Sequence, residues 1–321
     1  MNVGHALAAL RGAVGFLSRL PVGRDERAWE AFRGAPWTLP VAGYALGSLL
    51  ALVVGPALVA GLPGPTVALA YVLAVVALTG INHADGVADL GDAAVVHGGP
   101  ERRREVLGDT VTGVGGTLGL VLVVAGLALG ALGLPGLPLA VAVGLVVACE
   151  VGAKLAMAAL VTLGAPAHEG FGAAVAGDLS PRALPVPLVL GLPAVALPGV
   201  AVGGRPGAVT GGALPAGVVP AGVAVGTAAL GSALLAGLAL LWWARRRLGG
   251  VSGDVFGAGN ELARVVALHA GLVAWDLAPH ASLVVQDLAP RAGLAAQDLA
   301  PLGSALAAVE WLPEVVAWTP W

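Results

Sequence analysis

Three aspartates recur at helical spacing in the segment that reads Gly-Ile-Asn-His-Ala-Asp-Gly-Val-Ala-Asp-Leu-Gly-Asp. In a helix, Asp85, Asp89 and Asp92 stand at i, i+4 and i+7 and share one face, with His83 just before them. Like charges on one face destabilise a helix unless something neutralises them. Mg²⁺ prefers carboxylate oxygens and usually shares its shell with substrate phosphates. The spacing therefore predicts a magnesium site on these three aspartates, the alternative being a solvated acidic face.

A second polar segment follows and contains groups suited to phosphate. The run Glu101-Arg-Arg-Arg-Glu105 precedes Gly108-Asp-Thr-Val-Thr-Gly-Val-Gly-Gly116. A glycine-rich helix start offers free N–H groups to phosphate oxygens, although glycines also permit close helix packing. The arginines either bind phosphate or only anchor the chain beside a membrane. The candidates for phosphate or substrate contact here are Arg102, Arg103, Arg104, Thr110, Gly113 and Gly116, with Asp109 between them.

Further polar residues lie in otherwise apolar surroundings. Asp254, Asn260 and Glu261 are interleaved with glycines after the run Arg245-Arg-Arg247 and are further candidates for substrate contact. Lys154 stands four residues after Glu150 in an apolar stretch, so it is either half of an internal ion pair or part of a site. His168 and Glu169 are expected in a solvated loop.

The composition indicates which elements position these residues. The chain is 58% hydrophobic and 11% charged, with a mean hydropathy of +0.90, whereas a soluble domain usually has about 25% charged residues. We therefore expect an all-α, polytopic bundle of six to seven transmembrane helices with a polar site facing the cytoplasm. The six expected spans are about 38–61, 65–81, 117–135, 138–163, 183–204 and 213–244, and a weaker seventh is about 262–275.

Basic residues alternate with the spans. Arginines precede the first span, lie between the second and third and between the fourth and fifth, and follow the sixth, whereas the opposite loops contain only Arg205. The positive-inside rule makes the arginine-rich side cytoplasmic. The net charge of −3 indicates no nucleic-acid partner. The sequence thus predicts a multi-pass protein of the cell membrane, with homo-oligomerisation left open.

The C-terminal part differs in character. The sequence Asp-Leu-Ala-Pro recurs every 11 residues at 276–279, 287–290 and 298–301, and tryptophans follow at 311, 318 and 321. Asp followed by Pro is typical of a helix start. We expect a catalytic membrane domain over residues 1–275 and a repetitive appendage without catalytic work over 276–321.

The pattern His83-x-Asp85-Gly-x-x-Asp89-x-x-Asp92 resembles the signature of the cobalamin synthase family, the adenosylcobinamide-GDP ribazoletransferases. The resemblance covers about residues 10–270. Further motifs agree with it in order: Phe16-Leu-Ser-Arg-Leu-Pro-Val22, Leu39-Pro-Val-Ala-Gly43, Asp109-Thr110 with Gly113 and Gly116, and Gly249-Gly-Val-Ser-Gly-Asp254 with Gly257-Ala258 and Glu261. Among the departures, Lys154 stands where arginine is common and Arg264 replaces an expected acidic residue.

The resemblance implies a reaction. Such enzymes join α-ribazole, or its 5′-phosphate, to adenosylcobinamide-GDP, releasing GMP and forming adenosylcobalamin or its 5′-phosphate. Phosphoryl transfer of this kind depends mostly on positioning and charge neutralisation. The resemblance implies Mg²⁺ on the three aspartates, with Asp109 as a further ligand or the general base and His83 as the alternative base.

Two other functions compete with this interpretation. A CDP-alcohol phosphotransferase also uses an aspartate cluster at the membrane face, but Asp89 and Leu90 stand where that family has Ala-Arg. A transporter would place carboxylates near the middle of broken helices. Here the aspartates are expected at span ends on one side, which favours an interfacial enzyme site.

Overall fold

The computed structural model describes residues 2–23, 25–177, 179–199 and 218–291. Over these residues all regular elements are helices, and the one β-type contact is an isolated bridge between Pro166 and Val251. The expected all-α fold is confirmed. In chain order the helices are α1 (Val3–Leu17), α2 (Glu26–Arg33), α3 (Thr38–Val59), α4 (Gly64–Thr79), α5 (Asn82–Val95), α6 (Pro100–Leu107), α7 (Val114–Leu132), η1 (Leu134–Gly136), α8 (Leu139–Leu163), α9 (Phe171–Ala176), η2 (Pro181–Ala183), α10 (Pro185–Gly191), η3 (Leu192–Val195), η4 (Leu197–Gly199), α11 (Val218–Arg247) and α12 (Gly253–Arg291).

Five segments of the described chain are long and apolar enough to cross a membrane, and the pair α4–α5 is a sixth if its two helices count as one span. This agrees with the six spans expected before residue 245. The ends of the expected spans at 200–204 and 213–217 lie outside the described residues. The weaker seventh segment, 262–275, is helical as part of α12, which is not among the candidate spans found in the described residues.

One expected span ends at a sharp bend and another is interrupted, for reasons visible in the sequence. Gly80 has φ +75°, which an L side chain rarely adopts, and α5 leaves α4 there at an angle of 98°. The segment Pro181–Gly199 is one α-helix with three short 3₁₀ turns rather than a straight helix. Pro187, Pro193 and Pro198 lack the backbone N–H that a continuous helix needs.

Helix α8 lies at the centre of the bundle. Of its most apolar window 83% is buried, against 28% for α7, and it packs against α3, α11 and α12. Only the outer helices therefore offer wide apolar faces to lipid. A helix surrounded by protein in this way can carry polar groups that lipid would not tolerate.

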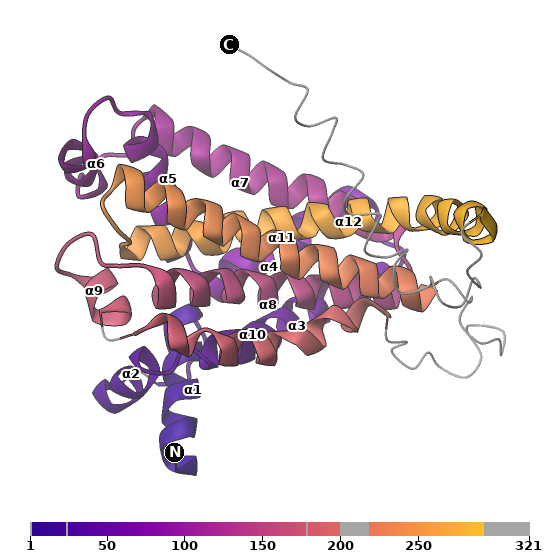
Figure 1. Ribbon diagram of the computed structural model, residues 1–321, viewed down its shortest axis with the longest axis horizontal. Coiled ribbons are helices and arrows are strands. Elements are labelled where there is room, and N and C mark those ends of the chain that lie inside the picture. The colour runs from indigo at the N-terminus through magenta and orange to yellow at the C-terminus, as the bar shows by residue number, and fades with distance from the viewer. Residues whose placement is uncertain (1, 24, 178, 200–217, 292–321) are drawn as a thin grey trace.

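The polar loops gather at one end of the molecule. In Figure 1, α6, α9 and the turn between α11 and α12 lie together at the left end of the long axis. Hydrogen bonds hold this end together: the guanidinium of Arg104 in α6 donates to the carbonyl of Leu248 at 2.7 Å, and that of Arg245 in α11 donates to the carbonyl of Leu163 at the end of α8. The arginine-rich segments at 102–104 and 245–247, which were expected on the same side of the membrane, thus lie at the same end of the molecule.

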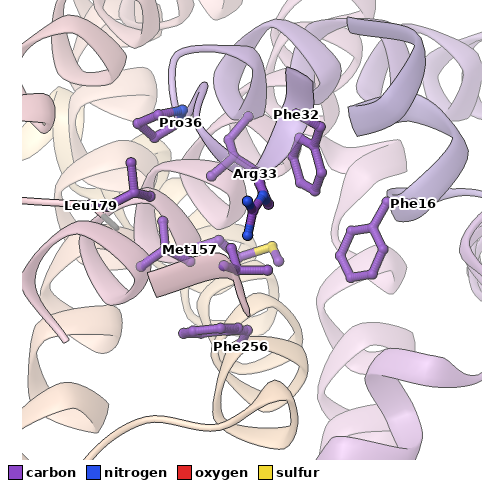
Figure 2. A pocket seen from close by; sticks show the side chains of 10 residues that line it. Phe16, Phe32, Arg33, Pro36, Met157, Leu179 and Phe256 are labelled. Carbon is purple, nitrogen blue, oxygen red and sulfur yellow. The ribbon is translucent and has the colours of Figure 1, made fainter. Parts of the chain in front are cut away.

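The N-terminal helices α1 and α2 project from the side of the bundle (Figure 1). Where they meet it, the side chains of Phe16 and Phe32 lie across from Met157 and Phe256, and Arg33 points between them (Figure 2). The pocket there holds about 20 Å³, room for about one water molecule. It is too small for a substrate.

The expected boundary between residues 275 and 276 falls inside a continuous helix. The backbone of α12 stays helical up to Arg291, so the first two Asp-Leu-Ala-Pro repeats lie within one helix and do not start new ones. The remainder of the expected appendage, 292–321, lies outside the described residues.

Candidate functional site

The aspartate-bearing segment is helical, as its spacing predicted, and forms α5 at the polar end. Asp85 is exposed and Asp89 is half-buried, and neither carboxylate has a hydrogen-bond or ion-pair partner among the described residues. Asp89 also interacts electrostatically with Asp254, Asp85 and Asp92. The site is therefore a cluster of mutually repelling carboxylates, and Asp254 belongs to it.

Asp254 joins the cluster because α5 and α12 touch backbone to backbone. A Cβ atom on Gly86 would lie 2.7 Å from the carbonyl oxygen of Asp254 and 2.9 Å from its Cα atom. Gly86 thus lets the first turn of α12 approach α5. The hydroxyl of Ser252 donates to the Asp254 carboxylate at 3.2 Å and helps to orient it.

Asp92 differs from its two neighbours. Its carboxylate accepts hydrogen bonds from the backbone N–H groups of Gly113 at 2.7 Å and Gly116 at 2.9 Å, at the start of α7. The first N–H groups of a helix have no partner within the helix and attract negative charge. The expectation that Gly113 and Gly116 bind substrate phosphate is corrected, because Asp92 uses those donors. Both of its oxygens are engaged in joining α5 to α7.

The three arginines of α6 have three different roles. Arg102 is exposed and pairs with Glu105 at 2.9 Å. Arg103 is buried and donates to the carbonyls of Ala93 and Ala94, at the last turn of α5. Arg103 therefore holds the end of α5, which corrects its predicted role in phosphate binding.

Arg104 lines an open pocket of about 460 Å³ beside the carboxylates, together with Glu101, Glu105, Leu107, Gly108, His168 and Asp254. Its guanidinium also pairs with Glu101 at 3.2 Å. A hydrogen bond from its own backbone N–H lowers the pKa of the Glu101 carboxyl, and Arg104 acts in the same direction. This pocket is large enough to take part of a substrate.

Asp109 and Thr110 lie in the exposed loop between α6 and α7. The Asp109 carboxylate accepts the N–H of Val111 at 3.1 Å, which is a local turn contact. The loop continues directly into the residues that bind Asp92. Asp109 is thus near the site in the chain but does not line the pocket.

Lys154, Asn260 and Glu261 are not at the pocket surface. They lie inside the bundle, where α8 meets α12, in a network completed by Glu150, Arg264 and His83. Lys154, Glu150 and Arg264 are 0% exposed. The prediction of direct substrate contact for Lys154, Asn260 and Glu261 is corrected, since each side chain is enclosed and engaged by its neighbours. For Lys154 and Glu150, the internal ion pair is confirmed.

The fit of a cation depends on the carboxylates that remain. Within the described part of the chain, no three His, Cys, Asp or Glu side chains lie close enough to enclose one ion. Asp85, Asp89 and Asp254 nevertheless have the chemistry that a hard cation prefers: carboxylate oxygens, like charge and no basic partner in hydrogen-bonding range among the described residues. They fit an ion that completes its shell with water and substrate phosphate.

Two features of the site were missed by sequence reasoning. His168 was expected in a solvated loop, yet it lines the pocket, with its Nδ1 atom 2.7 Å from the carbonyl of Glu169. Arg264 was noted only as a departure from the family pattern, but it pairs with both Glu150 and Glu261 in the bundle interior. Its spacing of i, i+3 from Glu261 was the available signal.

Comparisons with known proteins bear on this geometry. Residues 9–272 match the sequence model of the family described as cobalamin-5-phosphate synthase. An adenosylcobinamide-GDP ribazoletransferase from Halorubrum lacusprofundi is 53% identical over 278 residues, covering 84% of this chain and 98% of the relative. The enzyme of the same name from Haloquadratum walsbyi is 42% identical, covering 84% of this chain and 99% of the relative. The one from Halobacterium salinarum is 52% identical, covering 68% of this chain and 100% of the relative. No solved structure matches the chain.

Proposed function

This chain belongs to the cobalamin-5-phosphate synthase family, and we propose that it transfers α-ribazole, or its 5′-phosphate, onto adenosylcobinamide-GDP. In this reaction a ribazole hydroxyl oxygen bonds to the phosphorus attached to cobinamide. The bond from that phosphorus to the GMP oxygen breaks, the hydroxyl proton leaves, and GMP is released. The products are adenosylcobalamin (or its 5′-phosphate) and GMP.

One observation supports this function most directly: carboxylates of two helices lie together at the polar end of a membrane bundle, and one of them, Asp254, borders an open pocket. A pyrophosphate substrate and these carboxylates are both negatively charged, so the substrate can bind beside them only when a cation lies between the two. We propose that Asp85, Asp89 and Asp254 hold Mg²⁺, with Asp92 keeping the start of α7 against α5. When bound, the ion would neutralise charge on the phosphates.

The residues around the pocket are proposed to position the substrate. Arg104 can donate from its guanidinium to phosphate oxygens, since it is the arginine of α6 that lines the pocket. Arg102, at the exposed face of the same helix, can add a further contact. Asp109 is our candidate for the base that takes the ribazole proton, because its carboxylate makes one local hydrogen bond in an exposed loop.

The setting of the reaction is also proposed. The outer helices offer apolar faces to a bilayer, and the arginine-rich segments at 102–104 and 245–247 lie at the end that carries the carboxylates. The positive-inside rule places that end in the cytoplasm. We therefore propose a multi-pass enzyme of the cell membrane whose pocket opens to the cytoplasm.

The test is GMP release from adenosylcobinamide-GDP by purified protein in detergent. We expect release that needs both α-ribazole and Mg²⁺, and that stops when the metal is chelated. Release without α-ribazole would indicate hydrolysis. CMP release from a CDP-alcohol, or flux across proteoliposomes without GMP release, would instead favour the phosphotransferase or transporter alternative. Release unaffected by chelation would refute the magnesium site alone.

A further inference from the structure

A charged network lies buried directly beneath the carboxylate site. It contains two carboxylates, Glu150 and Glu261, and two cations, Lys154 and Arg264, so its formal charge sums to zero. Arg264 pairs with both carboxylates, and Lys154 lies 3.3 Å from Glu150. Buried charges are costly in a membrane protein, and residues of this kind are candidates for function.

The network extends to α5 through one amide. The Lys154 ammonium lies 2.6 Å from Oδ1 of Asn260. An ammonium can only donate, so the amide oxygen of Asn260 must face Lys154. The amide NH₂ group then faces Glu261 Oε1 at 3.1 Å and His83 Nδ1 at 3.2 Å. Lys154 therefore fixes which way the amide points.

The orientation of this amide determines the tautomer of His83. An NH₂ group can only donate, so His83 Nδ1 must accept, and the ring proton lies on Nε2. The competing arrangement, a proton on Nδ1 donated to Glu261, has the longer separation of 3.5 Å. It would also direct two donors, Nδ1–H and the Asn260 amide, at each other.

The second ring nitrogen is not fully enclosed, although the His83 side chain as a whole is buried. Nε2 of His83 has no partner among the described residues, and it is not among their enclosed unpartnered atoms. His83 stands two residues before Asp85, at the start of α5. An Nε2–H group at this place can donate to a substrate oxygen, whereas it cannot take a proton.

We infer that Lys154 and Asn260 are positioning residues that hold His83 in its Nε2–H form as a hydrogen-bond donor to a phosphate oxygen of the substrate. His83 is then an electrostatic stabiliser of the kind that lowers the barrier to phosphoryl transfer, and not the base. The tautomer follows from the structure alone. Only its use on phosphate rests on the proposed function.

The tautomer is tested by ¹⁵N–¹H spectra of the full chain labelled at histidine, in detergent, with the His83 signals assigned by their loss in His83→Gln. We expect the Nε2–H pattern in the wild type. His269 provides an internal reference for that pattern, because its Nε2 lies 2.9 Å from the carbonyl of Gly126, which can only accept. An Nδ1–H pattern for His83 would overturn the inference, and this result needs no core variant to fold.

The role of Asn260 in setting the His83 tautomer is tested with Asn260→Leu, which keeps the approximate shape of the side chain and removes its N–H donor. We expect the Nδ1–H form, directed at Glu261, to appear in this variant. A tautomer that remains wholly Nε2–H would overturn the role of Asn260. This readout needs no catalytic activity, so its failure is separable from failure of the proposed function.

Activity then distinguishes a donor from a base. His83→Gln retains an N–H donor near the position of Nε2, and His83→Ala does not. We expect kcat to fall about tenfold or less in the first and about a hundredfold or more in the second, with KM similar in both, since a base would contribute about 10²–10⁴-fold and be lost equally in each. Equal, large losses would overturn the donor role. His269→Gln is the control that should retain activity.

Discussion

The contact between α5 and α12 provides the most direct test of the site geometry. In Gly86→Ala, the new methyl carbon would meet the Asp254 carbonyl oxygen at 2.7 Å and its Cα atom at 2.9 Å. Both are backbone atoms, so no side chain can turn away to relieve the overlap. Ordinary contacts begin near 3.4 Å, and the two helices must therefore separate by several tenths of an ångström or more.

The magnitude follows from this displacement. Adding a methyl group to a well-packed interface costs about 1–3 kcal/mol. The displaced element is the first turn of α12, which carries Asp254. Because misplacement by about 1 Å at an active site can cost about 10²-fold in rate, we expect kcat to fall about ten- to a hundredfold while the protein still folds.

The assay is GMP release, measured beside thermal unfolding in the same detergent. Gly231→Ala is the matched control: Gly231 lies in α11, is exposed, and a Cβ there would meet no atom within 4 Å. Its replacement should leave activity unchanged and raise helix stability by up to about 1 kcal/mol. Wild-type activity and stability in Gly86→Ala would refute the close approach of α12 to α5.

Three other variants test neighbouring parts of the site. Asp89→Asn should abolish metal-dependent GMP release yet raise the unfolding temperature in chelator, because the removed charge is repelled by three carboxylates; wild-type turnover would contradict its role as a ligand. Asp92→Ala should lose about 0.5–2 kcal/mol of stability, measured by denaturation, as it leaves the first N–H groups of α7 without an acceptor. Arg264→Met should lower the free energy of unfolding by about 3–5 kcal/mol, because it leaves the two buried carboxylates, Glu150 and Glu261, with only one cation. The charge-balanced pair Arg264→Met with Glu150→Leu should recover much of that loss, and a double variant no more stable than the single would contradict the pairing.

The local features of the site were predictable from the sequence. The spacing of Asp85, Asp89 and Asp92 predicted a helix and its polar face, because residues separated by three and four positions lie on one side of a helix. The alternation of arginines with apolar segments predicted which loops share a face. Both patterns can be recognised along the sequence alone, because the spacing of the aspartates and the alternation of the arginines do not depend on how the helices pack.

The separation of roles among similar residues was not predictable. Asp92 looks like its neighbours in the sequence, but its position beside the start of α7 makes it an acceptor for backbone N–H groups. Arg102, Arg103 and Arg104 are consecutive, yet one is exposed, one holds the end of α5 and one lines the pocket. Successive helical residues point about 100° apart, so their partners depend on which helices pack around them.

The sequence by itself determined the membrane bundle, the helical aspartate cluster and the family. These depend on composition, periodicity and motif order, which are properties of the chain. Only the tertiary structure decided that Asp254 joins the aspartates and that Lys154, Asn260 and Glu261 are enclosed. The physical reason is that a polar residue in an apolar segment can face lipid, a pocket or another charge. The packing of α12 against α5 and α8 decides which of these three surroundings each polar residue has.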